Sequence, residues 1–137
     1  MDPLIKLQKK CVRTITFADK QDHTEPLFEQ LDILIFTKLV THRISLIMFK
    51  YATNQLPQPI SELFQRNDTI HAHNTRQREN LHLLIGRGEI IYKSFSFHAI
   101  HIWNHMSMHI SIEVSYPCYK KLSKRYLQNN NIIYRIR

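Results

Sequence analysis

The chain has 137 residues, of which 43% are hydrophobic, and its 19 Lys and Arg against 11 Asp and Glu give a formal net charge of +8. This length suits one domain, and no apolar run approaches the roughly 20 residues that span a bilayer, so a membrane-spanning chain is excluded. Cys11 and Cys118 form no CxxC motif, which argues against a disulfide framework and a thiolate metal site. We therefore expect an intracellular protein of the nucleus or cytoplasm, with no membrane partner.

The first predicted helix is amphipathic. It opens at Asp2 and Pro3, a capping residue followed by the residue favoured at the first helical position. Apolar residues recur along one face at helical spacing, at Leu4, Leu7, Cys11, Val12 and Ile15. The back of this helix is basic and carries Lys6, Lys9, Lys10 and Arg13.

Two further helices are predicted before residue 53. The second spans residues 24–31, with Thr24 as its cap and Pro26 tolerated in its first turn. The third spans residues 36–52 and is apolar around more than half of its circumference, which is typical of a helix at the centre of a core. Pro57 and Pro59 end it, because neither fits a helix interior.

The rest of the chain predicts loops, a hairpin and two helices. After one helical turn at residues 60–64, the polar residues 66–77 predict a loop. Two segments flank Gly86, Arg87 and Gly88, and this spacing predicts a β-hairpin over residues 81–97. Helices are predicted again over residues 99–106 and 117–127, before a frayed tail at residues 129–137. The expected fold is mainly α: a compact helical domain over residues 1–137 with a small β-hairpin.

Eight short strings follow one another in a fixed order between about Leu4 and Leu127. They are Leu7 to Lys10 (LQKK), Thr24 to Phe28 (TEPLF), Met48 to Tyr51 (MFKY), Leu56 and Pro57, His73 to Arg76 (HNTR), Ser94 to Phe97 (SFSF), Trp103 and Asn104, and the helix from Tyr119 and Lys120 onward. In this order they resemble the region downstream of the polymerase domain in LINE-type non-LTR retrotransposon reverse transcriptases of the jockey-like branch. Three positions depart from that pattern, since His98 replaces a glycine, Ser107 a proline and Tyr119 a phenylalanine.

The resemblance implies a fragment of an RNA-directed DNA polymerase without its catalytic part. The parent enzymes hold two metal ions on an aspartate pair, whereas no two of the 11 acidic residues here are adjacent. We therefore predict no catalytic residue, no cofactor and no metal. The role of a row of histidines stays open, because such rows rarely close a metal shell without Cys or carboxylate partners. The row consists of His98, His101, His105 and His109.

Basic residues at both ends of the chain are the candidate contacts for RNA or DNA, because clustered cations release counterions from phosphates. Those near the N-terminus are Lys6, Lys9, Lys10 and Arg13, and those near the C-terminus are Lys120, Lys121, Lys124 and Arg125. Arg76 and Arg78 of the polar loop join them. Solvated helix faces explain the same charges without any ligand. Trp103 is predicted as a core anchor, and Asn74 and Asn104 as structural residues that brace backbone groups.

Two main functions follow from the resemblance. The first is a non-catalytic segment that helps to hold template RNA or target DNA beside the upstream polymerase domain of the parent element. The second is a structural module that packs against the polymerase thumb without touching nucleic acid, for which the wide apolar face of residues 36–52 is the clue. An inactive remnant of a decayed element and a free-standing domesticated binder are the remaining alternatives.

Overall fold

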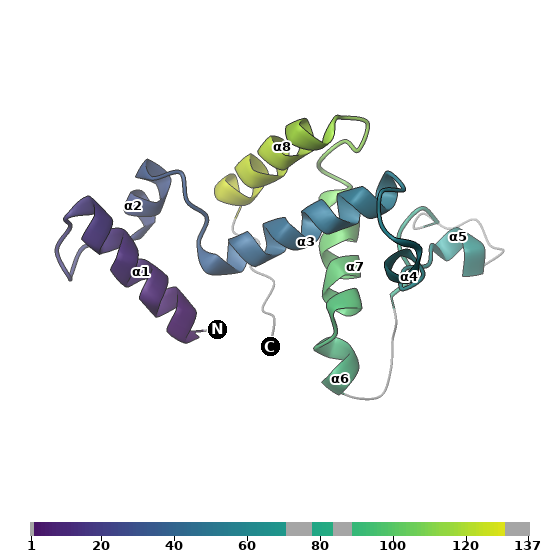
Figure 1. The fold of residues 1–137 in the computed structure, drawn as a ribbon, viewed down its shortest axis with the longest axis horizontal. Coiled ribbons are helices and arrows are strands. Elements are labelled where there is room, and N and C mark those ends of the chain that lie inside the picture. The colour runs from purple at the N-terminus through teal and green to yellow at the C-terminus, as the bar shows by residue number, and fades with distance from the viewer. Residues whose placement is uncertain (1, 71–77, 84–88, 131–137) are drawn as a thin grey trace.

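A computed structural model describes residues 2–70, 78–83 and 89–130, and the fold in these ranges is mainly helical, as predicted. Figure 1 shows the longest helix, α3, running through the middle of the molecule, with α8 along one side and α7 crossing it. The helices in chain order are α1 (Asp2–Thr16), α2 (Glu25–Gln30), α3 (Phe36–Ala52), α4 (Gln58–Ser61), α5 (Asn67–Ile70), α6 (Glu89–Tyr92), α7 (Phe95–Met106) and α8 (Tyr116–Asn129).

The core lies where α7 and α8 meet α3. Met48 and Phe49 of α3 are almost completely buried, and the Phe49 ring stacks on Tyr119 of α8 with 4.3 Å between ring centroids. The Trp103 ring of α7 also lies near Tyr119, with 6.4 Å between ring centroids. The central position predicted for residues 36–52 is therefore confirmed, as are the limits of this helix. Two helices, α7 and α8, together cover its broad apolar surface.

The apolar face predicted for α1 does not pack as an amphipathic pattern suggests. Of that face only Val12 is buried, whereas Leu4, Leu7 and Ile15 are 50, 56 and 60% exposed and Cys11 is also exposed. The helix instead contacts the body along a neighbouring side through Gln8. The Gln8 amide donates to the carbonyl oxygen of Leu34 (2.9 Å) and accepts from the backbone N–H of Phe36 (2.7 Å), so it caps the start of α3 from another helix.

The strand predicted over residues 89–97 is wrong, because those residues lie in α6, in the start of α7 and in the turn that joins the two helices. Ser94 has extended dihedral angles and its hydroxyl accepts from the backbone N–H of Phe97 (3.3 Å), which makes it the N-cap of α7. In the helix, Phe97 contacts the His101 ring four residues on, with 4.6 Å between centroids. Both glycines of the expected hairpin lie outside the described residues. An isolated antiparallel bridge joins Arg66 to Leu81.

Several element limits differ from the predicted ones. The turn expected at residues 60–64 begins earlier, at Gln58, because Pro59 is tolerated in the first turn of α4. Part of the predicted loop over residues 66–77 is a short helix, α5, whose first turn carries Asp68, a favourable charge at a helix N-terminus. The final helix is confirmed and starts at Tyr116 with Pro117 in its first turn. Thr24 precedes α2 as expected but makes no side-chain capping bond.

Candidate nucleic-acid interface

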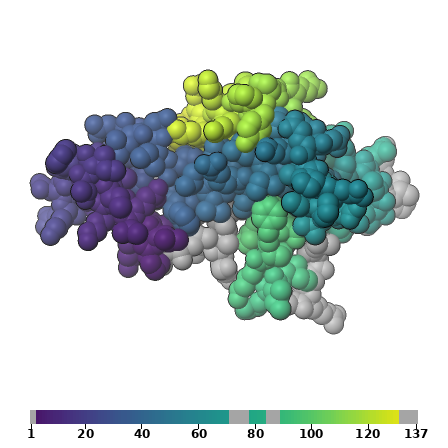
Figure 2. Space-filling view, viewed as in Figure 1, coloured from purple at the N-terminus to yellow at the C-terminus, as the bar shows by residue number. Residues whose placement is uncertain are grey.

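The densest group of exposed cations lies on α8. Residues Tyr119, Ser123 and Leu127 recur every four positions and are buried, so this side of the helix faces the core. Lys121 and Arg125 lie on the opposite side and Lys120 on a flank; all three are exposed, and the helix contains no acidic residue. Figure 2 shows α8 along the top of the molecule in this view.

Lys124 lies at the edge of this group and is partly engaged by an acid. Its ammonium group contacts the carboxylate (2.5 Å) and the carbonyl oxygen (2.8 Å) of Asp32, and Gln128 donates to the same carboxylate at 2.8 Å. The bond from Lys124, followed by the one from Gln128, lowers the pKa of Asp32. Lys124 therefore fixes α8 to the segment before α3, and the remaining α8 cations are the better candidates for phosphate contact.

His42 joins α3 to the basic side of α8. Its Nε2 lies 3.1 Å from the carbonyl oxygen of Lys120, and because a carbonyl only accepts, we assign the proton to Nε2. Burial is the main cause that lowers the pKa of His42; the bond to Lys120 opposes it, and the nearby charges of Arg43, Lys120 and Lys124 lower it further. We define the α8 basic face as Lys120, Lys121 and Arg125, with Lys124 at its edge.

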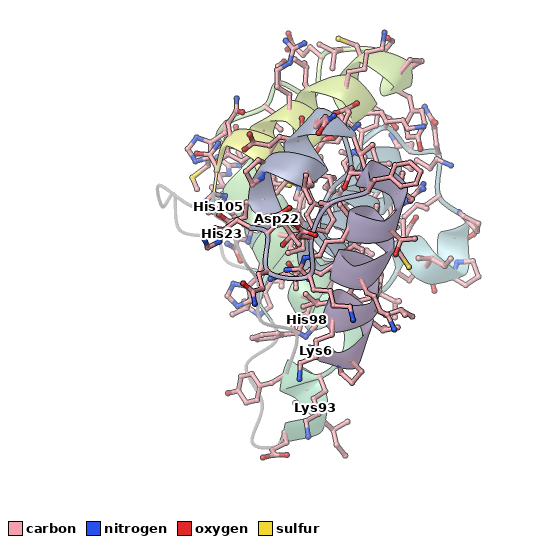
Figure 3. All side chains as sticks on the ribbon, turned by 90° about the vertical axis from the view of Figure 1, so that its left-hand side faces the viewer. Lys6, Asp22, His23, Lys93, His98 and His105 are labelled. Atoms are coloured by element: carbon pink, nitrogen blue, oxygen red, sulfur yellow. The ribbon has the colours of Figure 1, made fainter. Side chains whose placement is uncertain are left out.

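The basic residues of α1 form a separate group. Lys6 and Lys10 are exposed and Lys9 is half-buried, but Arg13 donates two hydrogen bonds, at 2.9 and 3.2 Å, to the carbonyl oxygen of Asp22. Arg13 thus braces the connection between α1 and α2. Figure 3 shows Lys6 in the lower half of the molecule and α8 at the top, which agrees with Figure 1. The fold does not merge the two basic ends into one surface.

The predicted loop contacts are only partly described. Arg76 and Asn74 lie outside the described residues. Arg78 is exposed, and its carbonyl oxygen accepts from the backbone N–H of Asp68 (3.1 Å). The guanidinium of Arg66 forms an ion pair with the same Asp68 (3.5 Å), so an acid lies close to this loop. The loop is therefore a weaker candidate for phosphate contact than α8.

Trp103 and Asn104 are structural, as predicted. Trp103 is only 7% exposed and belongs to the core. The amide of Asn104 accepts from the backbone N–H of Leu81 and donates to its carbonyl oxygen, both at 2.9 Å. These two bonds satisfy the backbone N–H and C=O of Leu81, as a neighbouring strand would do in a sheet. They also fix the segment around Leu81 to α7.

Three histidines of the row, His98, His101 and His105, lie in α7, and His109 lies in the connection that follows it. His98 is buried, and this burial, followed by the charge of His101, lowers its pKa. Burial and then the charge of His109 lower the pKa of His105 in the same way. His109 is exposed, and its ring stacks on Tyr126 of α8 at 5.3 Å and 23°. Within the described ranges, no three His, Cys, Asp or Glu side chains gather closely enough to hold a metal ion.

A hollow of about 300 Å³ lies beside the His109 and Tyr126 rings. It is formed where the connection after α7 meets the C-terminal half of α8, next to Arg125 of the basic face. Its walls are His109, Ile110, Ser111, Leu122, Arg125, Tyr126, Asn129 and Asn130. The sequence prediction missed this hollow, because residues 109–111 and 122–130 are brought together only by the packing of α8.

We compared the chain with models of protein families, with curated proteins and with solved structures, and none of the three comparisons finds a match. The likeness to retrotransposon reverse transcriptases therefore rests on the eight ordered strings. Among the described residues, no helix is both long enough and apolar enough to cross a membrane.

Proposed function

We propose that the chain is a non-catalytic C-terminal fragment of a retrotransposon RNA-directed DNA polymerase and that it binds RNA or DNA through the α8 basic face. The eight ordered strings support the origin. The observation that carries the binding function is the placement of Lys120, Lys121 and Arg125 at exposed positions of α8, with no acid on the same helix. In the parent element this surface would help to hold a nucleic acid strand beside the upstream polymerase domain.

The charge arrangement on α8 suits phosphate contact. Helix rise is about 1.5 Å per residue, so Lys120 and Arg125 lie within about 8 Å of one another along the axis. Both are anchored on a helix whose other side is packed in the core, so little conformational freedom of the backbone is lost on binding. Arginine adds planar, bidentate donors for phosphate oxygens, and the lysines add point charges.

The binding function is tested by titrating fluorescently labelled RNA and duplex DNA with the protein and following fluorescence polarisation. Three neutralised phosphates predict that log K falls with log salt at a slope of about −2 to −3. The variant Lys120→Gln/Lys121→Gln/Arg125→Gln should bind at least about tenfold more weakly at low salt. A matched control, Lys6→Gln/Lys10→Gln/Lys20→Gln, removes the same charge from other exposed positions. Absence of binding at low salt, or binding that salt leaves unchanged, contradicts the proposal.

A second function, a packing module for the upstream polymerase domain, is favoured by the exposed stripe of α1. The stripe consists of Leu4, Leu7, Cys11 and Ile15. The apolar surface of α3 that first suggested this function is covered by α7 and α8, so α1 carries the unpartnered surface instead. A row of exposed aliphatic side chains on a basic helix suits a partner with an apolar groove and an acidic rim.

The packing function is tested by expressing the chain with and without the polymerase region of the parent element. The variant Leu4→Gln/Leu7→Gln/Ile15→Gln should raise the solubility of the isolated chain and abolish co-purification with that region. The control Leu63→Gln changes an aliphatic side chain that is 51% exposed elsewhere on the surface. If the triple variant still co-purifies as the unmodified chain does, α1 is not the docking surface.

A further inference from the structure

The hollow beside α8 combines stacked rings with a neighbouring cation. The His109 and Tyr126 rings lie nearly parallel, with 5.3 Å between centroids, and His105 lies 5.1 Å from His109. His109 thus stacks on Tyr126 of α8, has His105 of α7 as a tilted neighbour at its other contact, and is itself exposed. Such rings offer flat apolar surfaces of the kind on which unpaired bases stack.

The polarity and charge of the residues that line the hollow indicate which kind of ligand it can bind. Leu122 and Ile110 contribute apolar surface, and the amide side chain of Asn129 contributes donors and an acceptor. Among the described residues, no Asp or Glu lines the hollow. Asn130 donates to the carbonyl oxygen of Tyr126 (2.9 Å), which holds the rim in place. Arg125, on the same rim, belongs to the α8 basic face. A volume of about 300 Å³ lies at the lower end of the range of small-molecule pockets.

We propose that this hollow receives one unpaired base of a single-stranded nucleic acid, stacked on the exposed His109 ring that Tyr126 supports from its other face, while Arg125 contacts the adjoining phosphate. The inference rests on the proposed binding function and adds the class of ligand: single strands, read through a base, rather than duplex. A duplex offers no unpaired base to the hollow and reaches only the basic face. A ligand that carried charge alone would use Arg125 and leave the rings without a role.

The test compares two labelled single strands of equal length in fluorescence polarisation titrations. One strand carries bases and the other has abasic residues throughout, so both present the same phosphate charge. We expect the protein to bind the base-containing strand at least about fivefold more tightly, the lower bound for stacking one base on a protein ring. His109→Ala should remove this preference and leave the affinity for the abasic strand unchanged.

A matched control keeps the result specific to the hollow. His23→Ala removes the same side chain from an exposed position between α1 and α2 (Figure 3) and should change neither affinity. Because His109 is exposed, its replacement leaves the core intact. Equal binding of both strands, or a base preference that His109→Ala does not alter, overturns the inference while the binding function stands. If neither single strand binds at low salt but duplex DNA does, the inference is likewise overturned; if duplex DNA also fails to bind, the proposed function itself fails.

Discussion

At the scale of single residues, Asn104 contributes most clearly to holding a segment without regular secondary structure. Leu81 is only 3% exposed, and both of its backbone groups are bonded to the Asn104 amide. The variant Asn104→Ala leaves a buried N–H and a buried C=O without these bonds, which should lower the free energy of unfolding by about 2–4 kcal/mol. Urea denaturation followed by circular dichroism measures this. A loss below about 0.5 kcal/mol, typical of a surface substitution, would show that the two bonds are not needed.

A second residue-scale prediction concerns the pH dependence of stability. The pKa of His98 is lowered from its ordinary 6.5 by burial, and its Nε2 has no hydrogen-bond partner among the described residues. The unfolded chain therefore binds more protons than the native one below about pH 6.5, so native stability falls as pH decreases through that value. His42 and His105 act in the same direction, since burial lowers their pKa values too.

The measurement is the free energy of urea unfolding at neutral and at mildly acidic pH. His98→Leu should flatten the acid loss and leave the neutral stability equal or higher, because leucine needs no hydrogen bond in the core. Equal pH dependence in the variant and the unmodified chain would mean that His98 titrates alike in both states.

At the scale of elements, Ser94 is the N-cap of α7, a helix that begins where a strand was predicted. Its hydroxyl caps α7, so Ser94→Ala should destabilise the fold by about 1 kcal/mol. Ser115, the N-cap residue of α8, makes no side-chain capping bond, which makes Ser115→Ala the matched control with a smaller effect. Thermal unfolding of the two variants compares them directly. Equal losses would argue against the capping role of Ser94.

The helices also show which structural features the sequence pattern could predict and which it could not. Residues 36–52 were placed correctly, because apolar residues recur around more than half of the helix circumference before two prolines that stop it. Residues 94–97 alternate serine and phenylalanine, and this period of two outweighed the capping signal of Ser94. The apolar face of α1 was identified, but which of its sides touches the body depends on Gln8 and the start of α3, a contact between distant segments.

At the scale of the whole molecule, the fold keeps the two groups of basic residues, on α1 and on α8, apart. Both basic ends of the chain were predicted as contacts for RNA or DNA. In the fold, α1 and α8 lie apart, and α8 lies along the upper side of α3 (Figure 1). The cations of α8 lie beside a hollow with aromatic walls. The hollow depends on the contact between the His109 and Tyr126 rings. No local sequence pattern predicts this contact, because the two residues are far apart in the chain. The net charge of +8 therefore matters less than its placement.

The most direct measurement of the central claim is the salt-dependent affinity for nucleic acid of the variant Lys120→Gln/Lys121→Gln/Arg125→Gln, beside the control Lys6→Gln/Lys10→Gln/Lys20→Gln. Binding through the α8 basic face predicts at least about a tenfold loss and a shallower salt slope for the first variant, and a much smaller change for the second. Equal losses in both variants, or no loss in the first, would contradict it.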